Sequence, residues 1–410
     1  MKRLLIAVGV IFVISTLFLV AQIRRVLPKQ SLPQSVKAED VFVPGPEAEG
    51  ADGKKTPKRT LIFVPVLNAV MPNGVNTVYA APFQIAWENL KNNTVKESIS
   101  LYGLPRVTDF LNREMNSKDL LIPPAYFAAA DFKQENIENK VASAARKNKN
   151  PLEKDDIAVT NPLDIVAYGH MFRDIKFDPN FEEGKITFNP SQGTPWEVKA
   201  FGIHNYDPRD NAQAEMAAQV GVNYYKDDSY ILTINDANTI TYNGKEYGNE
   251  VILAMLPRER TLAATVCVAL DLMNKPEPLS AWDQFLAPEI AFNDTQHYKE
   301  LESRKVLNTK FITQMPGCDC AGTICNGCEA VVGKALQTTK FILNAEGSSP
   351  KAAMASAPSV TVPEQQKNPI YRTMYFDRPF LIMMREPGKE RPYFAMWVDN
   401  TEPMNKIKPK

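Results

Sequence analysis

The sequence predicts an α+β fold built from large, mainly antiparallel sheets with helices packed over them. Short apolar runs typical of buried strands are concentrated late in the chain, and two of them flank a turn sequence. Elsewhere, apolar residues recur at helical spacing. Hydrophobic residues make up 44% of the 410 positions and charged residues 23%, so the chain can bury the large core that such sheets require.

The strand signals are continuous apolar runs rather than alternating ones. Residues 251–256 form one such run, which ends at Pro257, and residues 380–384 and 393–398 form two more. Between the last two lie residues 386–389, Glu-Pro-Gly-Lys, in which Pro sets φ and Gly accepts a positive φ. We therefore expect a C-terminal β-hairpin, and a hairpin this apolar has to lie in the core.

Two segments have apolar residues three and four positions apart, as on one face of a helix. These residues are Ile137, Val141, Ala144 and Ala145 in the first segment and Leu262, Val266 and Leu270 in the second. Both segments are predicted to be helices that pack over the sheets.

The N-terminus predicts export or membrane anchoring. Residues 4–23 are apolar, and at ~1.5 Å per residue a helix of that length crosses about one hydrocarbon layer. Basic residues lie on both sides of this stretch, so charge does not set its orientation. Residues 1–26 are therefore interpreted either as an uncleaved transmembrane anchor or as a cleaved signal peptide. Both interpretations place the rest of the chain on the extracytoplasmic side, membrane-anchored or secreted.

The remaining chain is predicted to hold a single large domain. Residues 27–59 are rich in Pro, Gly and charged residues and have no apolar periodicity, as in a flexible tether. From residue 60 to residue 403, helix and strand signals alternate without a second linker, which favours one domain. Residues 404–410 are interpreted as a short tail.

Composition and motifs argue against several functional classes. The 47 basic residues balance the 47 acidic ones, so the chain has no electrostatic footprint for a nucleic-acid partner. The sequence contains neither Gly-x-Ser-x-Gly nor His-Glu-x-x-His, and its three histidines have no metal-binding spacing. We therefore predict no enzyme activity, no catalytic residues, no metal ligands and no cofactor.

Two segments of the C-terminal third carry a family resemblance. Residues 334–347, Lys-Ala-Leu-Gln-Thr-Thr-Lys-Phe-Ile-Leu-Asn-Ala-Glu-Gly, precede a variable loop rich in Ala and Pro, and residues 376–382, Phe-Asp-Arg-Pro-Phe-Leu-Ile, follow it. In order and spacing they resemble the serpin strand that leads into the hinge of the reactive centre loop and the serpin segment after that loop. Weaker similar segments lie upstream, at residues 76–86, 165–177, 254–257 and 288–301.

The resemblance implies a serpin-like domain with an exposed loop before the C-terminal hairpin, and the function of a protease inhibitor. In inhibitory serpins, cleavage of this loop by the target serine or cysteine protease lets the loop insert as a strand into the large sheet. The hinge residues that the family pattern assigns are Gly347, Ser348, Ser349, Pro350, Ala352 and Ala353, and the candidate scissile bond joins Thr361 and Val362. Lys367 and Arg372 are alternative cleavage points for trypsin-like proteases.

Several departures from the family pattern support an alternative, a non-inhibitory serpin-fold protein with a binding or structural role. Pro350 lacks the N–H that an inserted strand needs, and Ala345 stands where the family has an acidic residue. The usual serines near the start of the central helix and the usual histidine before the hinge are also missing. Their places are taken by Ala80, Ala81, Gln84, Leu336 and Gln337, and residues 61–71 leave room only for a reduced first helix.

Four of the five cysteines form a cluster just before the hinge strand. Cys318, Cys320, Cys325 and Cys328 have the spacing C-x-C-x4-C-x2-C. Zinc is one candidate for four such sulfurs, but outside the cytoplasm two disulfides that staple the loop are the plainer interpretation. Bridging Cys-x-Cys neighbours would be strained, which favours pairing across the two halves, and the connectivity stays open. Cys267 is expected to be a buried free thiol.

Overall fold

The computed structural model describes residues 60–103, 105–113, 120–122, 125–147, 152, 154–171, 175–313, 315, 319–321, 324–326, 329–346 and 371–408. The chain divides into a unit of residues 1–40 and a unit of residues 41–410, and all described residues belong to the second. The expected anchor or signal peptide and the tether lie outside the described residues. Within the described part of the chain, no helix has the length and apolar character needed to cross a membrane.

An eight-stranded sheet contains the predicted C-terminal hairpin. Its strands, in spatial order, are β1 (Leu61–Val64), β2 (Asn76–Ala80), β21 (Phe394–Val398), β20 (Phe380–Arg385), β11 (Glu250–Met255), β8 (Ser229–Asn235), β7 (Val220–Lys226) and β12 (Glu277–Pro278). Strands β20 and β21 pair antiparallel, and their residues are almost all buried. Gly388 supplies the positive φ of the turn between them, at +78°. The predicted hairpin and its place in the core are therefore confirmed.

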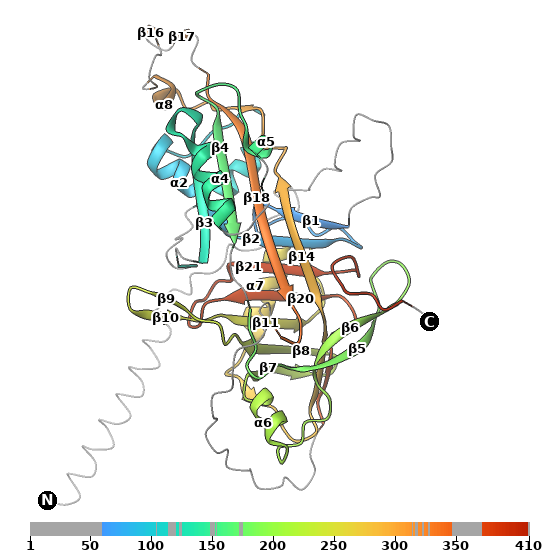
Figure 1. The fold of residues 1–410 in the computed structure, drawn as a ribbon. Helices are drawn as coiled ribbons and strands as arrows, with labels where there is room; N and C mark the ends of the chain where they lie inside the picture. The colour runs from blue at the N-terminus through green and yellow to red at the C-terminus, as the bar shows by residue number, and fades with distance from the viewer. Residues whose placement is uncertain are drawn as a thin grey trace, which may run out of the picture. The chain divides into compact units, whose positions relative to one another are not determined.

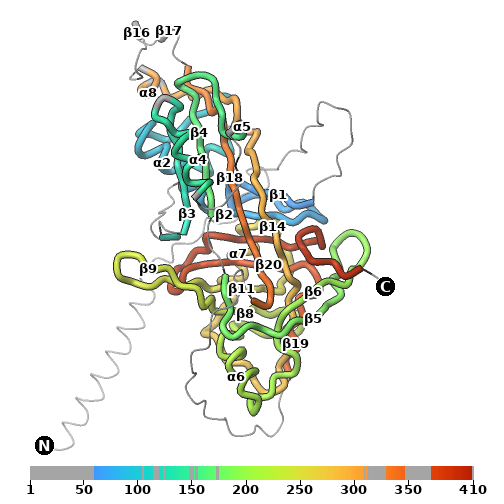
Figure 2. Tube along the Cα trace, viewed as in Figure 1, coloured from blue at the N-terminus to red at the C-terminus, as the bar shows by residue number. Residues whose placement is uncertain are grey.

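A five-stranded sheet holds the longest strand, β18 (Val331–Leu343). Its neighbours are β14 (Ile290–His297) on one side and β4 (Ile165–Met171) on the other, with β3 (Tyr126–Phe132) beyond β4 and the short β15 (Arg304–Lys305) also on β18. Figure 2 traces β18 in orange between β4 and β14. The other described neighbours in this sheet are antiparallel, but β4 and β18 run parallel.

A four-stranded sheet completes the large sheets, in the order β19 (Thr373–Tyr375), β13 (Gln284–Pro288), β6 (Trp196–Ile203) and β5 (Glu182–Phe188). Two small hairpins pair β9 (Ile240–Tyr242) with β10 (Lys245–Tyr247) and β16 (Asp319–Ala321) with β17 (Ile324–Asn326). With these sheets, most of whose pairings are antiparallel, the predicted α+β class is confirmed.

The helices are short, and several of them lie against strands of the sheets (Figure 1). They are α2 (Pro82–Asn89) with a π-helical continuation (Leu90–Val95), α3 (Pro105–Asn112), α4 (Ile137–Lys147) with a preceding 3₁₀ turn (Lys133–Glu135), α5 (Lys154–Ile157), α6 (Asn211–Ala217), α7 (Leu262–Leu272) and α8 (Thr309–Thr313). The two helices predicted from apolar spacing, α4 and α7, are thus confirmed.

The segment expected to hold a reduced first helix instead begins with a strand. Residues Leu61–Val64 pair parallel to β2, from Leu61 opposite Asn76 to Val64 opposite Tyr79. The cause is local: Ile62, Phe63 and Val64 are β-branched or aromatic, and Pro65 follows directly. The expectation of a helix here was wrong.

Two helices pack on the five-stranded sheet. Helix α4 packs Ile137 and Val141 against Val166 and Tyr168 of β4 and Leu336 of β18, so it covers the junction of these two strands. Helix α2 packs on β3 and β4 near Gly169.

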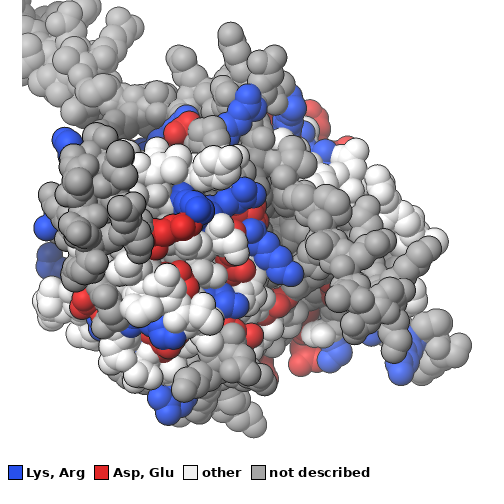
Figure 3. All heavy atoms as spheres, turned by 90° about the horizontal axis from the view of Figure 1, so that it is seen from above, with Lys and Arg blue, Asp and Glu red and all other residues white. Residues whose placement is uncertain are grey.

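Charged side chains are mixed on the surface. On the face drawn in Figure 3, Lys and Arg alternate with Asp and Glu among uncharged residues, and no large patch of one sign gathers on the atoms described there.

We predict that Gly169→Ala destabilises the protein by ~1–3 kcal/mol, because the added Cβ would lie 2.3 Å from the Phe83 backbone nitrogen and force α2 away from β4. The matched control is Gly248→Ala, whose Cβ would meet its nearest atom at 3.8 Å. Urea unfolding of both variants measures the difference. Equal stabilities would show that α2 does not sit tightly on β4.

Candidate functional site

The expected loop leaves the fold at the end of β18. The last described residues before it, Ala345 and Glu346, are held by backbone hydrogen bonds. Phe181 N–H donates to the Ala345 carbonyl at 2.9 Å, and Phe177 N–H donates to the Glu346 carbonyl at 3.4 Å. Ala345 is buried. The two residues that precede the loop are therefore held against the rest of the fold.

The loop returns to the fold at Arg372, whose guanidinium forms a buried ion pair with Asp283. Its Nε and Nη2 donate to Asp283 Oδ2 at 2.8 and 2.6 Å, and its backbone N–H donates to Oδ1 at 2.9 Å. The Asp283 side chain is fully buried, and that of Arg372 is 11% exposed. Strand β19 begins one residue later and pairs with β13. The specificity pocket of a protease cannot bind an arginine side chain held in this way, so the prediction of Arg372 as an alternative cleavage point was wrong. The other alternative, Lys367, lies outside the described residues.

Both ends of the loop lie near the C-terminal end of β18. Ile290, the first residue of β14, pairs with Leu343, the last residue of β18. Strand β13 ends two residues before Ile290, and its Leu286 lies opposite Tyr375 of β19. The loop therefore starts and returns at the same end of the five-stranded sheet.

The parallel pairing of β4 and β18 makes their junction a place where one more strand fits. Pairing runs from Val332 opposite Ile165 to Thr339 opposite Met171, with an irregularity at Gly333. A chain that leaves the C-terminal end of β18 and folds back beside it is antiparallel to β18, and hence also antiparallel to β4. Insertion there would replace one parallel pairing with two antiparallel ones, which are slightly more stable per residue.

Side chains hold this junction closed. Tyr168 of β4 donates its hydroxyl to Thr338 Oγ1 of β18 at 3.1 Å, and Thr338 Oγ1 lies 2.9 Å from Thr295 Oγ1 of β14. Tyr168 and Thr338 are fully buried. An inserted strand would have to break the Tyr168 bond and pass beneath α4.

A glutamine joins β18 to the start of α2. Gln337 Oε1 accepts the Phe83 N–H at 3.1 Å, and Gln337 Nε2 donates to Thr339 Oγ1 at 3.0 Å. Helix α2 has Ala81 at its N-cap, which has no side chain to accept that N–H. Gln337 thus supplies the cap from a distant strand. The sequence does show that the helix starts at Ala81 without a capping side chain. It does not show that Gln337 is the residue that takes this role.

His170 is buried on β4 beside the same junction, opposite Thr338 on one side and Phe127 of β3 on the other. Burial lowers its pKa from 6.5 to about 4, so the ring is neutral near pH 7. Within the described residues, no cluster of three or more His, Cys, Asp or Glu side chains could hold a metal ion.

The sequence-predicted loop residues Gly347, Ser348, Ser349, Pro350, Ala352, Ala353, Thr361 and Val362 all lie outside the described residues. So do Cys318 and Cys328 of the cysteine cluster. The backbone of the small β16–β17 hairpin places Cys320 directly opposite Cys325.

Cys267, on α7, is a free thiol, as expected, but it is half-buried rather than fully buried. Burial and the nearby Asp271 raise the pKa of its thiol.

No protein-family model and no curated protein matches the sequence. Solved structures do match. Thyroxine-binding globulin in complex with thyroxine has a TM-score of 0.46 at 10% identity, over 80% of this chain and 93% of that chain. The thermophilic serpin tengpin in its native state has a TM-score of 0.43 at 11% identity, over 80% and 90%. Mouse protein Z-dependent protease inhibitor has a TM-score of 0.43 at 11% identity, over 80% and 91%.

We predict that Arg372→Gln destabilises the protein by ~3–5 kcal/mol, because it leaves the buried Asp283 carboxylate without its counter-charge. The matched control is Arg209→Gln, which removes an exposed arginine paired with Asp207 and should leave the stability nearly unchanged. Urea unfolding distinguishes the two. Equal losses would mean that the loop end is not anchored by this ion pair.

We also predict a pH dependence from His170. Its folded pKa lies below the unfolded value, so the unfolded chain binds the proton more readily and stability falls as pH drops from 6.5 towards 4. At 1.36 kcal/mol per pKa unit the loss is about 3 kcal/mol, complete below pH 4. When the free energy of unfolding is measured across this pH range, its dependence on pH should disappear in His170→Gln and remain in His204→Gln. A slope unchanged in His170→Gln contradicts the assignment.

Proposed function

We propose that this chain is a serpin-like protein that presents residues 347–370 as a reactive loop to an extracytoplasmic serine or cysteine protease. After cleavage, the loop inserts between β4 and β18. The observation that carries the proposal is the parallel pairing of β4 and β18. The C-terminal end of β18 leads into the loop.

The lengths of loop and strand support this proposal. Strand β18 has 13 residues, and the segment between the hinge glycine and the candidate scissile bond, residues 348–360, also has 13. At ~3.3 Å per residue, each spans about 43 Å when extended. The loop before Thr361 can therefore cover β18 from Leu343 back to Val331.

The anchored return at Arg372 makes full insertion depend on cleavage. If residues 348–360 lay beside β18, residue 361 would be at the far end of that strand. Residues 361–371 would then have to return to β19, near the starting end, with a reach of at most ~3.6 Å per residue. That is about 40 Å at full stretch, less than the length of the strand plus the step to β19. Cleavage at Thr361–Val362 removes this restraint, so an intact loop stays outside the sheet.

The candidate scissile bond indicates the protease class. A loop cleaved after Thr361 suits a protease whose specificity pocket takes a small uncharged side chain, whereas Lys367 would suit a trypsin-like protease. Residues 1–26 are proposed to bring the domain to the membrane or into the secreted fraction, where it would meet such a protease.

A second candidate function, a non-inhibitory binding protein, is favoured by two prolines. Pro350 and Pro358 both lie in the segment that would insert, and neither has an N–H. Each leaves a buried carbonyl on a neighbouring strand without its donor, at a cost of ~1–3 kcal/mol. In this case the loop would bind a partner without entering the sheet.

The two candidates are separated by incubating the protein with a panel of serine and cysteine proteases. An inhibitor gives a covalent complex that survives SDS, as the main proposal predicts. The double variant Pro350→Ala/Pro358→Ala should increase the fraction of complex relative to fragments, because both missing donors are restored. Pro369→Ala, beyond the candidate scissile bond, is the matched control and should leave that fraction unchanged.

Simple cleavage to fragments by every protease, with wild type and double variant alike, would contradict the inhibitor proposal and support the binding protein.

A further inference from the structure

A pocket of about 450 Å³ lies at one end of the eight-stranded sheet, away from the strand ends that carry the hairpin turn of residues 386–392. Its walls come from the end of β11, the start of β8, the end of β21 and the segment that precedes β20. This volume falls in the range of small-molecule sites. The proposed function makes no use of this pocket.

The floor of the pocket is apolar and well buried. Met255, Leu256 and Trp397 line it and are each at most 6% exposed. Trp397 Nε1 donates to Asp399 Oδ2 at 3.2 Å, which fixes the indole ring in place. An apolar ligand group could cover this floor without any rearrangement of the core.

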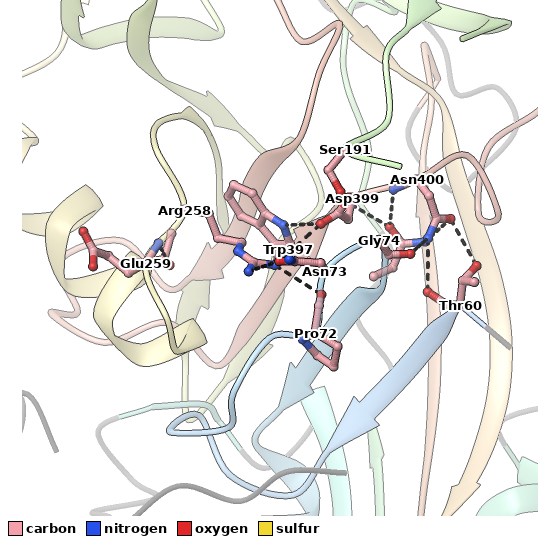
Figure 4. A network of polar contacts seen from close by, with 12 residues as sticks. Thr60, Pro72, Asn73, Gly74, Ser191, Arg258, Glu259, Trp397, Asp399 and Asn400 are labelled. Atoms are coloured by element: carbon pink, nitrogen blue, oxygen red, sulfur yellow. Dashed lines mark hydrogen bonds and ion pairs between the residues drawn. The ribbon is translucent and has the colours of Figure 1, made fainter. Parts of the chain in front are cut away.

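On one side of the pocket, the positive charge of Arg258 is balanced by the negative charge of Asp399 (Figure 4). Asp399 is buried and accepts from Trp397 Nε1 and the Ser191 hydroxyl. Arg258 Nη1 lies 3.8 Å from Asp399 Oδ2 and also donates to the Pro72 carbonyl at 3.2 Å. Arg258 Nη2 donates to Asn73 Oδ1. These contacts use only part of the five N–H donors of the guanidinium.

The other side carries a second arginine whose charge is weakly matched. Arg378 lies 3.4 Å from Asp377, and both side chains are more than one-third exposed, so this ion pair is worth little. Arg378 Nη2 donates to the backbone carbonyl of Asp228 at 2.9 Å. Asp228, which is exposed, also lines the pocket, and its negative charge disfavours ligands with two negative charges.

We propose that this pocket binds a small amphipathic monocarboxylate. Its carboxylate pairs with Arg378 and with the unused donors of Arg258, and its apolar body lies on Met255, Leu256 and Trp397. A ligand with one negative charge is favoured over one with two, because Asp399, Asp228 and Asp377 already stand beside Arg258 and Arg378. A guanidinium recognises a carboxylate by parallel N–H···O bonds, which a neutral amide cannot reproduce.

The proposal is tested by calorimetric titration of the full chain with octanoate, with octanamide as a neutral analogue of the same shape, and with inorganic phosphate. Octanoate is expected to bind, octanamide at least about tenfold more weakly, and phosphate not to compete. Arg378→Gln should weaken octanoate binding at least about tenfold, while Arg209→Gln, which removes an exposed arginine elsewhere, should leave it unchanged.

Melting curves of both variants test whether they are folded, as expected for side chains that are each more than one-third exposed. Three results would each overturn the proposal: no octanoate binding to the wild type, octanamide binding as tight as octanoate, or an octanoate affinity that Arg378→Gln leaves unchanged. Competition by phosphate would also contradict it, because it would indicate a simple anion site without an apolar part.

Discussion

The parallel pairing of β4 with β18 is the constraint on which the rest of the five-stranded sheet depends. It gives the sheet a junction where a strand folding back from β18 would be antiparallel to both neighbours. The same junction is closed by the Tyr168–Thr338 hydrogen bond and covered by α4. The same two strands therefore both resist and could accept an inserted strand. The relative stability of the closed and the inserted sheet decides whether the protein can inhibit a protease by loop insertion.

The two ends of the loop restrain the fold in different ways. At its start, backbone hydrogen bonds to the carbonyls of Ala345 and Glu346 hold the last described residues before the loop. At its return, the Arg372 guanidinium is tied to Asp283 by a buried ion pair in which Nε and Nη2 both donate to Oδ2. Because both ends lie near one end of β18, an intact loop is too short to lie along the whole strand and return. A chain cut between these anchors has no such limit.

Much of the fold was predictable because its signals are local. The buried runs that become β11, β20 and β21 and the apolar spacing of α4 and α7 follow from the sequence alone. The contacts that close the site were not, because they join residues far apart in the chain. Gln337 caps α2 from 254 positions away, and nothing in the local sequence links the two. Arg372 looked like a protease target until its fully buried partner Asp283 was located in space.

Hydrogen–deuterium exchange after a single cut in the loop tests the central claim most directly. If the cut loop enters the β4–β18 junction, amides of residues 348–360 become protected, and those of β4 and β18 remain protected or gain protection. The inhibitor account predicts this gain at every inserted position except Pro350 and Pro358, which have no amide hydrogen. Fast exchange of residues 348–360 after cleavage, with β4 and β18 unchanged, would contradict it.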